Sequence, residues 1–308
     1  MPTVLITGGT GLIGTALSKA LIAKGYDVII FTRRIKSAIE NPQSSIQYAT
    51  WNVEQQTINE TAIQQADFII HLAGANIAEK RWTKARKREI VESRTKSSQL
   101  LVNALKETPN KVQAVISASA IGWYGINDNN SKPFVETDPP ARNFLGETCR
   151  QWEASIEPVK DLDKRLVKLR TGIVLSNNGG AYPEFKKSFK FGVAAILGSG
   201  KQIISWIHIE DLVNLYIHAI ENNMMKGVYN AVAPHPVSNK ELILQIANAK
   251  KGIFIPVHVP EFFLKAILGE MGVEVLKTAT VSSEKIQQAG FVFQYPTVEK
   301  AILQLEGS

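Results

Sequence analysis

The sequence predicts an α/β fold built on a doubly wound, mostly parallel sheet, and three observations support this prediction. An apolar strand at residues 4–7 runs directly into a turn rich in glycine, which leads into an apolar helix at residues 12–24. A second strand follows at residues 27–31. Strand and helix signals then alternate along the first half of the chain, which is the pattern of βαβ units.

Three glycines spaced by three stand where the first strand meets the first helix. Gly8 permits the sharp exit from the strand, Gly11 lets the backbone approach a pyrophosphate, and Gly14 lets the helix pack closely on the sheet. The amino end of a helix also presents N–H groups and a partial positive charge that favour phosphate. In this context the turn predicts a Rossmann dinucleotide-binding domain, with a purely structural glycine turn as the alternative. The residues predicted to line the cofactor here are Thr7, Gly8, Thr10, Gly11, Leu12, Ile13 and Gly14.

The end of the second strand indicates which dinucleotide is bound. Sites selective for NAD usually place a carboxylate there to bind the ribose 2′-hydroxyl, whereas this chain has Thr32, Arg33 and Arg34. A guanidinium suits a 2′-phosphate, and each charge-assisted hydrogen bond contributes about 1.5–3 kcal/mol. The sequence therefore predicts NADP(H) in preference to NAD(H). The alternative is that both arginines are solvated loop charges.

Length and composition fit a globular enzyme of this kind. The chain has 308 residues, of which 44% are hydrophobic and 20% charged, so it has room for one large domain or for one domain with a smaller lobe. No apolar run approaches membrane-spanning length and the chain enters a strand without a basic leader, which predicts a cytoplasmic protein with no membrane partner. The lone cysteine, Cys149, excludes a disulfide framework and a cysteine-rich zinc site, and no metal is predicted.

The net charge of +7 does not by itself indicate a nucleic-acid partner. Much of the excess lies in residues 80–96, where lysines and arginines alternate with Glu89 and Glu92, a pattern typical of one solvated helix face. A basic patch for nucleic acid is the alternative, but no ribbon of basic and aromatic residues supports it. The predicted partner is therefore a small molecule and not a nucleic acid.

The pattern of predicted secondary structure changes after about Leu175, from alternating strands and helices to a loop, short helices and isolated strands. We therefore expect two units. A dinucleotide-binding domain takes residues 1–175 with a return segment at about 205–230, and a smaller discontinuous lobe that closes over the cofactor takes residues 176–204 and 231–308. Within the first unit, further strands are predicted at residues 46–51, 67–72, 112–117 and 166–169, and helices at 83–106 and 147–157.

Three further segments, together with the glycine turn, carry a resemblance to a known family. They are Asp-Phe-Ile-Ile-His-Leu-Ala-Gly at residues 67–74, Ser-Ala-Ser-Ala-Ile-Gly-Trp-Tyr-Gly at 117–125 and Trp-Ile-His-Ile-Glu-Asp-Leu at 206–212. Over nearly its whole length the chain resembles the extended short-chain dehydrogenase/reductase family of nucleotide-sugar epimerases and dehydratases. The resemblance implies a Rossmann fold of about seven parallel strands with a small C-terminal substrate domain.

A narrower likeness points to one branch of that family. This branch holds atypical members that are labelled as epimerase-family proteins, resemble NAD-dependent epimerases and dehydratases, and have an unsettled activity. The residues that carry the likeness lie at 71–77, 81–83, 149–153, 169–175, 205–208 and 268–271.

The catalytic machinery that the resemblance implies is incomplete in this chain. Family enzymes use a Ser or Thr that polarises the substrate, a Tyr that transfers its proton, and a Lys four residues later that lowers the Tyr pKa and holds the nicotinamide ribose. Ser119 matches the first role, but Leu145 stands where the Tyr should be and Cys149 where the Lys should be. Leucine has no proton to transfer, and a thiol with a pKa of about 8.5 is mostly neutral at pH 7. Cys149 is expected to be either a small apolar plug or a nucleophilic or redox thiol.

Tyr124 is the predicted surrogate acid, because the loop at residues 119–125 should lie beside the nicotinamide and the substrate. The alternative is a packed aromatic side chain whose hydroxyl is bonded to the backbone. A Tyr-x-x-x-Lys pattern does occur at residues 182–186, but it lies beyond the sixth strand and contains Pro183, which argues against a helix of the required kind. Tyr182 stays a candidate only if the lobe carries it back over the nicotinamide.

Other positions are expected to line the crevice at the carboxyl ends of the strands, where open α/β sheets bind their ligands. Asn52 should contact the adenine, and the backbone after His71 should lie near the cofactor. Arg81 and Trp82 would suit a ligand with an anion and a flat or apolar group. The loop at residues 198–202 resembles one that cradles substrate phosphate, with a surface turn as the alternative. These predictions add Asn52, Leu72, Ala73 and Gly74 to the cofactor site, and Arg81, Trp82, Tyr182 and Lys201 to the substrate site.

Two functions follow from these residues. The first is an NADP(H)-dependent oxidoreductase or nucleotide-sugar-epimerase-like enzyme, in which Ser119 orients a carbonyl or alcohol and Tyr124, another group or water supplies the proton. The second is a non-catalytic NADP(H)-binding protein, a redox sensor or assembly factor. The missing Tyr-Lys pair favours the second function, whereas the retained Ser119 loop and a complete second lobe favour the first. The substrate, a nucleotide-sugar or another anionic small molecule, and the oligomeric state stay open.

Overall fold

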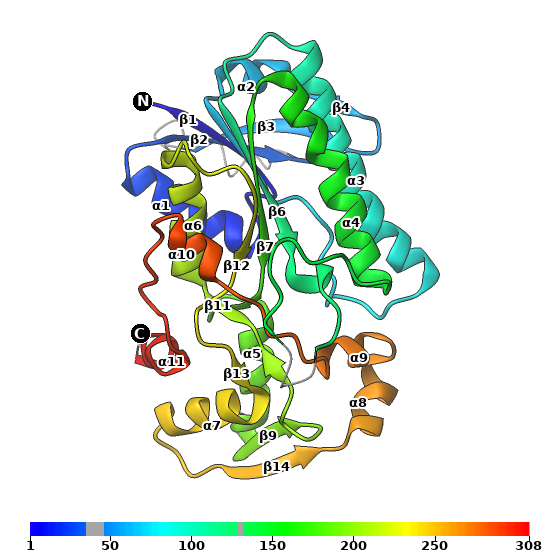
Figure 1. Cartoon of the computed structure of the whole chain (residues 1–308), viewed down its shortest axis with the longest axis vertical. Helices are drawn as coiled ribbons and strands as arrows, with labels where there is room; N and C mark the ends of the chain where they lie inside the picture. The colour runs from blue at the N-terminus through cyan, green and yellow to red at the C-terminus, as the bar shows by residue number, and fades with distance from the viewer. Residues whose placement is uncertain (35–45, 128–131, 308) are drawn as a thin grey trace.

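A computed structural model describes residues 1–34, 46–127 and 132–307. Within this part of the chain, an eight-stranded sheet crosses the upper half of the molecule in the order β12-β7-β6-β5-β1-β2-β3-β4 (Figure 1). Neighbouring strands from β12 to β3 pair in parallel, and β4 pairs antiparallel with the end of β3. The strands are β1 (Thr3–Thr7), β2 (Asp27–Thr32), β3 (Ile46–Asn52), β4 (Thr57–Ile58), β5 (Phe68–His71), β6 (Ala114–Ala120), β7 (Arg165–Thr171) and β12 (Gly227–Ala231).

The predicted doubly wound, parallel α/β fold is confirmed, with one more strand than the expected seven. The additional strand, β4, contributes only the pairs Trp51 with Ile58 and Asn52 with Thr57. A strand of two residues has no hydrophobic period of its own, so no sequence pattern announces it.

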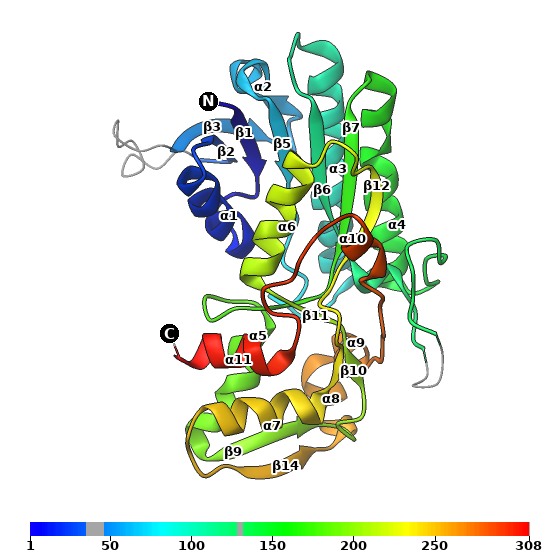
Figure 2. The ribbon, with the colours of Figure 1, turned by 60° about the vertical axis from the view of Figure 1, so that its left-hand side comes forward.

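Alternate side chains of the central strands enter two separate cores, one on each face of the sheet. Along β1, Val4 and Ile6 lie in one core and Leu5 in the other, and none of the three is exposed. Helices α1 and α6 cover the first face, and α2, α3 and α4 cover the second (Figure 2). Burial on both faces explains why these strands are continuous apolar runs. The helices are α1 (Leu12–Ala23), α2 (Glu60–Gln65), α3 (Lys84–Glu107), α4 (Phe144–Ile156) and α6 (Ile209–Glu221).

The strand order reverses at β1, in the middle of the sheet. At the carboxyl end of β1, Thr7 pairs with Phe31 of β2 on one side and with His71 of β5 on the other. The connections to these two neighbours leave in opposite directions, and such a reversal opens a crevice at the carboxyl ends of the strands. The glycine turn begins at this point.

A second group of elements lies beneath the sheet, at the bottom of Figure 1. It packs around a third core, in which Tyr182, Trp206 and Leu242 are fully buried. No helix in the described part of the chain is long and apolar enough to cross a bilayer. The elements of this group are α5 (Ala181–Lys186), β9 (Val193–Leu197), β10 (Ile203–Ile204), β13 (Val237–Ser238), α7 (Asn239–Ala249), β14 (Ile255–Val259), α8 (Glu261–Leu268), α9 (Met271–Val275) and α11 (Val298–Gly307).

The predicted division into two units stays a prediction. Residues 231–308 were all expected in the smaller lobe, whereas Ile286, Phe291 and Phe293 lie in the core that α1 and α6 form against the sheet. The reason is that α10 (Glu284–Gln288) packs beside β12, at the outer edge of the sheet. The chain therefore returns to the first unit before it ends in α11.

The parallel strands β8 (Ile173–Leu175) and β11 (Trp206–His208) connect the sheet to the lower group. At the end of β11, His208 caps α6, because its Nδ1 accepts the N–H of Glu210 at 3.2 Å. The Asp211 carboxylate accepts the N–H groups of Gln294 at 2.8 Å and Tyr295 at 3.0 Å. His208 thus fixes the start of α6 at this junction, and Asp211 joins α6 to the segment that contains Gln294 and Tyr295.

Candidate functional site

The glycine turn after β1 is built on close backbone contacts. Gly8 has a φ of 69°, a conformation that favours glycine, and a Cβ atom there would lie 2.9 Å from the Leu72 carbonyl. A Cβ atom on Gly14 would lie 2.5 Å from the Gly8 oxygen and 2.5 Å from Gly9 Cα. The helix therefore packs on the turn itself, and at Gly14 only a glycine fits.

The amino end of α1 is open to an anion. Gly11 is the N-cap residue, with no side chain to cap the helix and no acidic residue in the first turn. A Cβ atom on Gly11 would have one protein atom within contact range, the Gly8 oxygen at 3.3 Å, so the protein leaves the space beside it unfilled. Thr10 is exposed next to this space, and the helix continues through Leu12 and Ile13. An unfilled space before uncapped N–H groups fits a phosphate.

A buried hydrogen-bond chain fixes the segment after β5 against the turn. Thr7 Oγ1 accepts the N–H groups of Leu72 at 3.1 Å and Ala73 at 3.2 Å, and it lies 2.8 Å from His71 Nδ1. His71 Nε2 lies 3.1 Å from Ser98 Oγ on α3. Burial lowers the pKa of His71 to about 4, so the ring is neutral at pH 7. The Thr7 hydroxyl then donates to Nδ1 and Nε2–H donates to Ser98, which is a positioning role for both Thr7 and His71.

The predicted adenine end forms a pocket at the carboxyl ends of β2 and β3. It is lined by Arg33, Trp51, Asn52 and Ile58 of β4, together with the polar residues Thr50, Thr57 and Asn59. The side-chain oxygen Oδ1 of Asn52 accepts two N–H groups of the following turn, each at 3.0 Å, so this side chain is held in place. Arg33 and Arg34 are exposed, and in the described part of the chain neither forms an ion pair. Nearby, Thr32 Oγ1 and the Arg34 backbone bond to each other.

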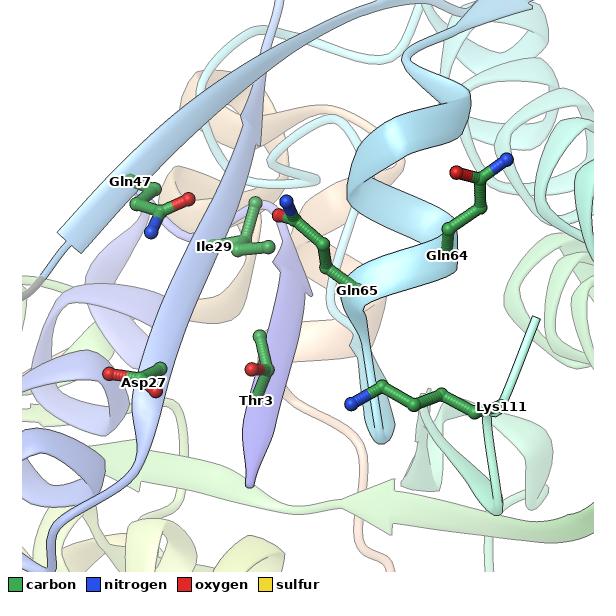
Figure 3. A pocket seen from close by; sticks show the side chains of 7 residues that line it. All are labelled: Thr3, Asp27, Ile29, Gln47, Gln64, Gln65 and Lys111. Atoms are coloured by element: carbon green, nitrogen blue, oxygen red, sulfur yellow. The ribbon is translucent and has the colours of Figure 1, made fainter. Parts of the chain in front are cut away.

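A different pocket opens at the opposite edge of the sheet, where β1 and β2 begin (Figure 3). Thr3 and Asp27 stand at the first positions of these strands, and Gln65 and Lys111 reach in from the helix and loop beside them. None of the residues predicted for cofactor or substrate lines this pocket. Because open α/β sheets bind ligands at the carboxyl ends of their strands, this pocket does not belong to the dinucleotide site.

Ser119 lies in a buried ion-pair network and not on an open surface. Its Oγ donates to Glu153 Oε1 at 2.7 Å, and only 3% of the residue is exposed. The same carboxylate binds Arg170 through Nε at 2.7 Å and Nη2 at 3.1 Å, while Lys168 Nζ lies 3.6 Å from Oε2. The Ser119 proton is thus directed to Glu153 and away from any substrate carbonyl.

Tyr124, the predicted surrogate acid, is fully buried. Its hydroxyl donates to Asn230 Oδ1 at 2.6 Å and accepts from Arg170 Nη1 at 3.0 Å. Burial raises its pKa to about 12, which makes proton release at neutral pH unfavourable. The short helix η2 (Ile121–Trp123) turns the chain inward, so Tyr124 does not present the exposed hydroxyl expected of it. The alternative of a packed aromatic fits better, although the hydroxyl bonds to side chains and not to the backbone.

Leu145 and Cys149, at the positions of the missing Tyr and Lys, fill space between α4 and η2. A Cβ atom on Gly122 would lie 3.3 Å from Leu145 Cβ and 3.6 Å from Cys149 Sγ. The thiol donates to the Ala120 carbonyl at 3.7 Å, and burial raises its pKa to about 12. A thiol that is neutral and buried is inert as a nucleophile.

The four substrate candidates do not converge. Trp82 is buried, donates from Nε1 to the Ile77 carbonyl at 2.8 Å, and packs edge-on against Phe144. Tyr182 is buried in the lower core, where its hydroxyl donates to Glu306 at 2.8 Å. Arg81 and Lys201 are both exposed; the first packs against Gly269, and the second follows a turn in which Gly198 and Gly200 have positive φ angles.

Sequence reasoning missed several charged residues that are not solvated. Residues 80–96 were expected to form one solvated face, but Arg86 is 5% exposed and pairs with Glu79 and Glu89. Arg94 also turns inward, toward Gly74. The spacing of eight residues between them places both on one side of a helix, in line with the buried Ile90 between them, and that was the available signal. Arg170, near the end of a buried strand, was a second signal of an internal ion pair.

A sequence model of the NAD dependent epimerase/dehydratase family matches residues 4–231. This chain belongs to that family. A second model, described as a domain of unknown function (DUF1731), matches residues 259–305. Epimerase family proteins of Staphylococcus saprophyticus and Arabidopsis thaliana are 35% and 33% identical to the chain, over 99% and 97% of its length and 99% and 85% of theirs. The chain is thus an NAD(P)-binding protein of the epimerase/dehydratase type.

Solved structures of the family share the whole architecture. The chain superimposes on a human epimerase family protein, described as a crystal structure with NADPH, with a TM-score of 0.87 at 28% identity over 99% of both chains. A UDP-N-acetylglucosamine 4-epimerase from Bacillus cereus superimposes with a TM-score of 0.76 at 18% identity, over 99% of this chain and 98% of that one, which is a likeness of fold alone.

The contacts of the glycine turn give a first prediction. Gly14→Ala should lower the free energy of unfolding by about 2 kcal/mol or more, because the added methyl meets backbone that cannot move aside. Gly11→Ala should cost less than about 1 kcal/mol, since its new Cβ meets only the Gly8 oxygen, at 3.3 Å, but it should weaken nucleotide binding. Urea denaturation and nucleotide titration of both variants measure the difference. Equal losses of stability would contradict the packing described here.

The position of Tyr124 gives a second prediction. Tyr124→Phe should lower the free energy of unfolding by about 1–3 kcal/mol, because Asn230 and Arg170 each lose a buried partner. Its nucleotide affinity should match that of the wild type. Tyr26→Phe, which removes a less buried hydroxyl 3.4 Å from Glu221, is the matched control and should change stability by less than about 0.5 kcal/mol. A weakened nucleotide affinity at unchanged stability would instead place Tyr124 in the ligand site.

Proposed function

We propose that this chain is an NADP(H)-binding protein whose output depends on the bound nucleotide and not on the family's Tyr-Lys proton transfer. One observation carries the cofactor preference. Arg33 lines a pocket with Trp51 and Asn52 at the ends of β2 and β3, and no ion pair of the described residues engages it. An NAD-selective site would favour a carboxylate at this edge. The human relative described with NADPH supports the same preference.

The residues that would hold the dinucleotide lie along the carboxyl edge of the sheet. The turn from Gly8 to Gly14 and the uncapped start of α1 suit the pyrophosphate. Arg33 and Arg34 suit the 2′-phosphate, and Asn52 the adenine side. Because both arginines are exposed, solvent screening keeps their contribution at the lower end of the range for charge-assisted bonds.

Bound NADP(H) supplies hydride transfer, and the protein must supply the proton. None of the three residues considered for that step is free. Ser119 donates to Glu153, Tyr124 donates to Asn230, and burial keeps Cys149 protonated. These engagements favour a redox sensor or an assembly or regulatory protein, in which the nucleotide changes how the chain binds a partner.

An oxidoreductase or nucleotide-sugar-epimerase-like enzyme is the second candidate. The lower lobe favours it, because residues 259–305 match a domain model of their own and so the lobe that closes over the cofactor in our prediction is retained. The substrate would be a carbonyl or alcohol of an anionic small molecule, for which Arg81 and Lys201 are exposed cations. A panel of such compounds, followed by nicotinamide absorbance, separates the two candidates. Turnover with any member would favour the enzyme, whereas a nucleotide-dependent change in partner binding would favour the sensor.

The cofactor preference gives a third prediction. Wild-type protein should bind NADPH at least about tenfold more tightly than NADH, since one charge-assisted bond of about 1.5 kcal/mol corresponds to that ratio. The double variant Arg33→Ala/Arg34→Ala should lose this preference and keep its affinity for NADH. Titration followed by nicotinamide fluorescence measures both affinities, and Arg150→Ala, which removes an exposed arginine of α4, is the control. An unchanged preference in the double variant would contradict the assignment of the 2′-phosphate.

A further inference from the structure

Arg94 is a cation of α3 that points into the protein beside the segment after β5. A Cβ atom on Gly74 would lie 3.1 Å from its guanidinium carbon Cζ and 3.3 Å from its Cγ. On the other side, Cζ lies 4.9 Å from the centre of the Trp152 ring of α4. The side chain therefore occupies the gap between the Gly74 segment and α4, and it is only partly exposed.

No carboxylate balances this charge in the described part of the chain. Its one hydrogen bond there runs from Nη1 to the Ile90 carbonyl at 2.9 Å, within the same helix. The neighbours that act on it electrostatically are Cys149, a neutral thiol, and Arg86, a like charge. Burial lowers its pKa to about 10, so it stays protonated at neutral pH. By contrast, the inward-facing Arg86 and the buried Arg170 both form ion pairs with glutamate carboxylates.

The indole of Trp152 adds a second unmet donor at the same place. Its Nε1 is buried and has no hydrogen-bond partner among the residues that the structure describes. The Arg94 guanidinium and the Trp152 indole N–H therefore lie side by side, and the described residues supply fewer hydrogen-bond acceptors than these donors need. Buried donors without acceptors cost free energy, and a ligand rich in oxygen would remove part of that cost.

The position of Gly74 connects Arg94 to the dinucleotide site. Gly74 is exposed and follows Leu72 and Ala73, which Thr7 holds against the glycine turn. Cys149 also stands where the family resemblance expects the lysine that holds the nicotinamide ribose. The guanidinium thus lies beside Gly74, directly after the segment that contacts the glycine turn, and near Cys149, the position of the missing cation.

We propose that Arg94 binds the nicotinamide half of the dinucleotide, through its ribose oxygens, and replaces from α3 the cation that α4 lacks at Cys149. This inference rests on the proposed function, because it requires that the chain bind NADP(H). It assigns the two ends of the nucleotide to different arginines: Arg33 to the adenosine 2′-phosphate and Arg94 to the nicotinamide ribose. A packing role over Trp152 alone is the competing explanation.

The test compares three nucleotides by calorimetric titration of the full chain. NADPH and NADH both carry the nicotinamide half, whereas adenosine 2′,5′-bisphosphate carries the adenosine end alone. Arg94→Met should weaken NADPH and NADH equally, by about tenfold or more, and change the affinity for the bisphosphate less than twofold. Arg94→Lys, which keeps the charge, should recover part of the loss. Arg88→Met is the matched control on the same helix, with a side chain that is 76% exposed, and should bind all three as the wild type does.

Three other outcomes overturn the inference. Unchanged affinity of Arg94→Met for NADPH and NADH would leave Arg94 with the packing role. A loss that extends equally to the bisphosphate would mean that the substitution disturbs the whole site, and a lower melting temperature of the free variant would identify that cause. A wild-type chain that binds none of the three nucleotides would instead refute the proposed function, on which this inference rests. A chain that binds NADPH without preferring it over NADH would refute the role of Arg33 and leave that of Arg94 to be judged by its own variants.

Discussion

The buried ion pair between Glu153 of α4 and Arg170 of β7 is the interaction around which the candidate site is organised. Their side chains are 6% and 2% exposed. Charges this deep are tolerated only when every oxygen and N–H group finds a partner, since breaking such a pair costs about 3–5 kcal/mol. Ser119 and Tyr124 are among the required partners. The two hydroxyls that a catalytic role would need are therefore part of what keeps the pair stable.

The network also fixes the geometry of four elements around it. It joins the end of β6 to α4 through Ser119, and α4 to β7 through Arg170. From β7 it reaches β12. The Asn230 side chain accepts a hydrogen bond from the Tyr124 hydroxyl, and the Asn230 backbone N–H donates to Glu136. Because the members of this cluster share so many partners, the cluster has two consequences for the site. It gives a rigid edge for a bound nucleotide, and it leaves no hydroxyl free to move a proton.

Much of the fold followed from the sequence, because its signals are local. The parallel strands bury both faces and so appear as apolar runs. The predicted strand at residues 27–31 differs from β2 by one residue at its end, and the predicted helix at 83–106 differs from α3 by one residue at each end. The glycine turn likewise needs only its own residues and the strand before it. The direction of side chains did not follow from local signals: a motif located Tyr124 near the end of β6, but its side chain is buried and its hydroxyl bonds to Asn230 and Arg170. Which arginines of α3 face inward depends on the partner elements, and composition alone treats them all as solvated.

The loss of a lysine on α4 and the presence of an inward arginine on α3 are explained by one electrostatic constraint. Arg94 and Cys149 lie close enough for the charge of the first to act on the thiol of the second. A lysine at position 149 would place a second positive charge beside Arg94 in a partly desolvated gap, where like charges repel strongly. The two cations therefore exclude each other, and a chain that keeps Arg94 gains from a small neutral residue at position 149. Cys149 and Leu145 introduce no second charge beside Arg94, and both side chains pack against Gly122.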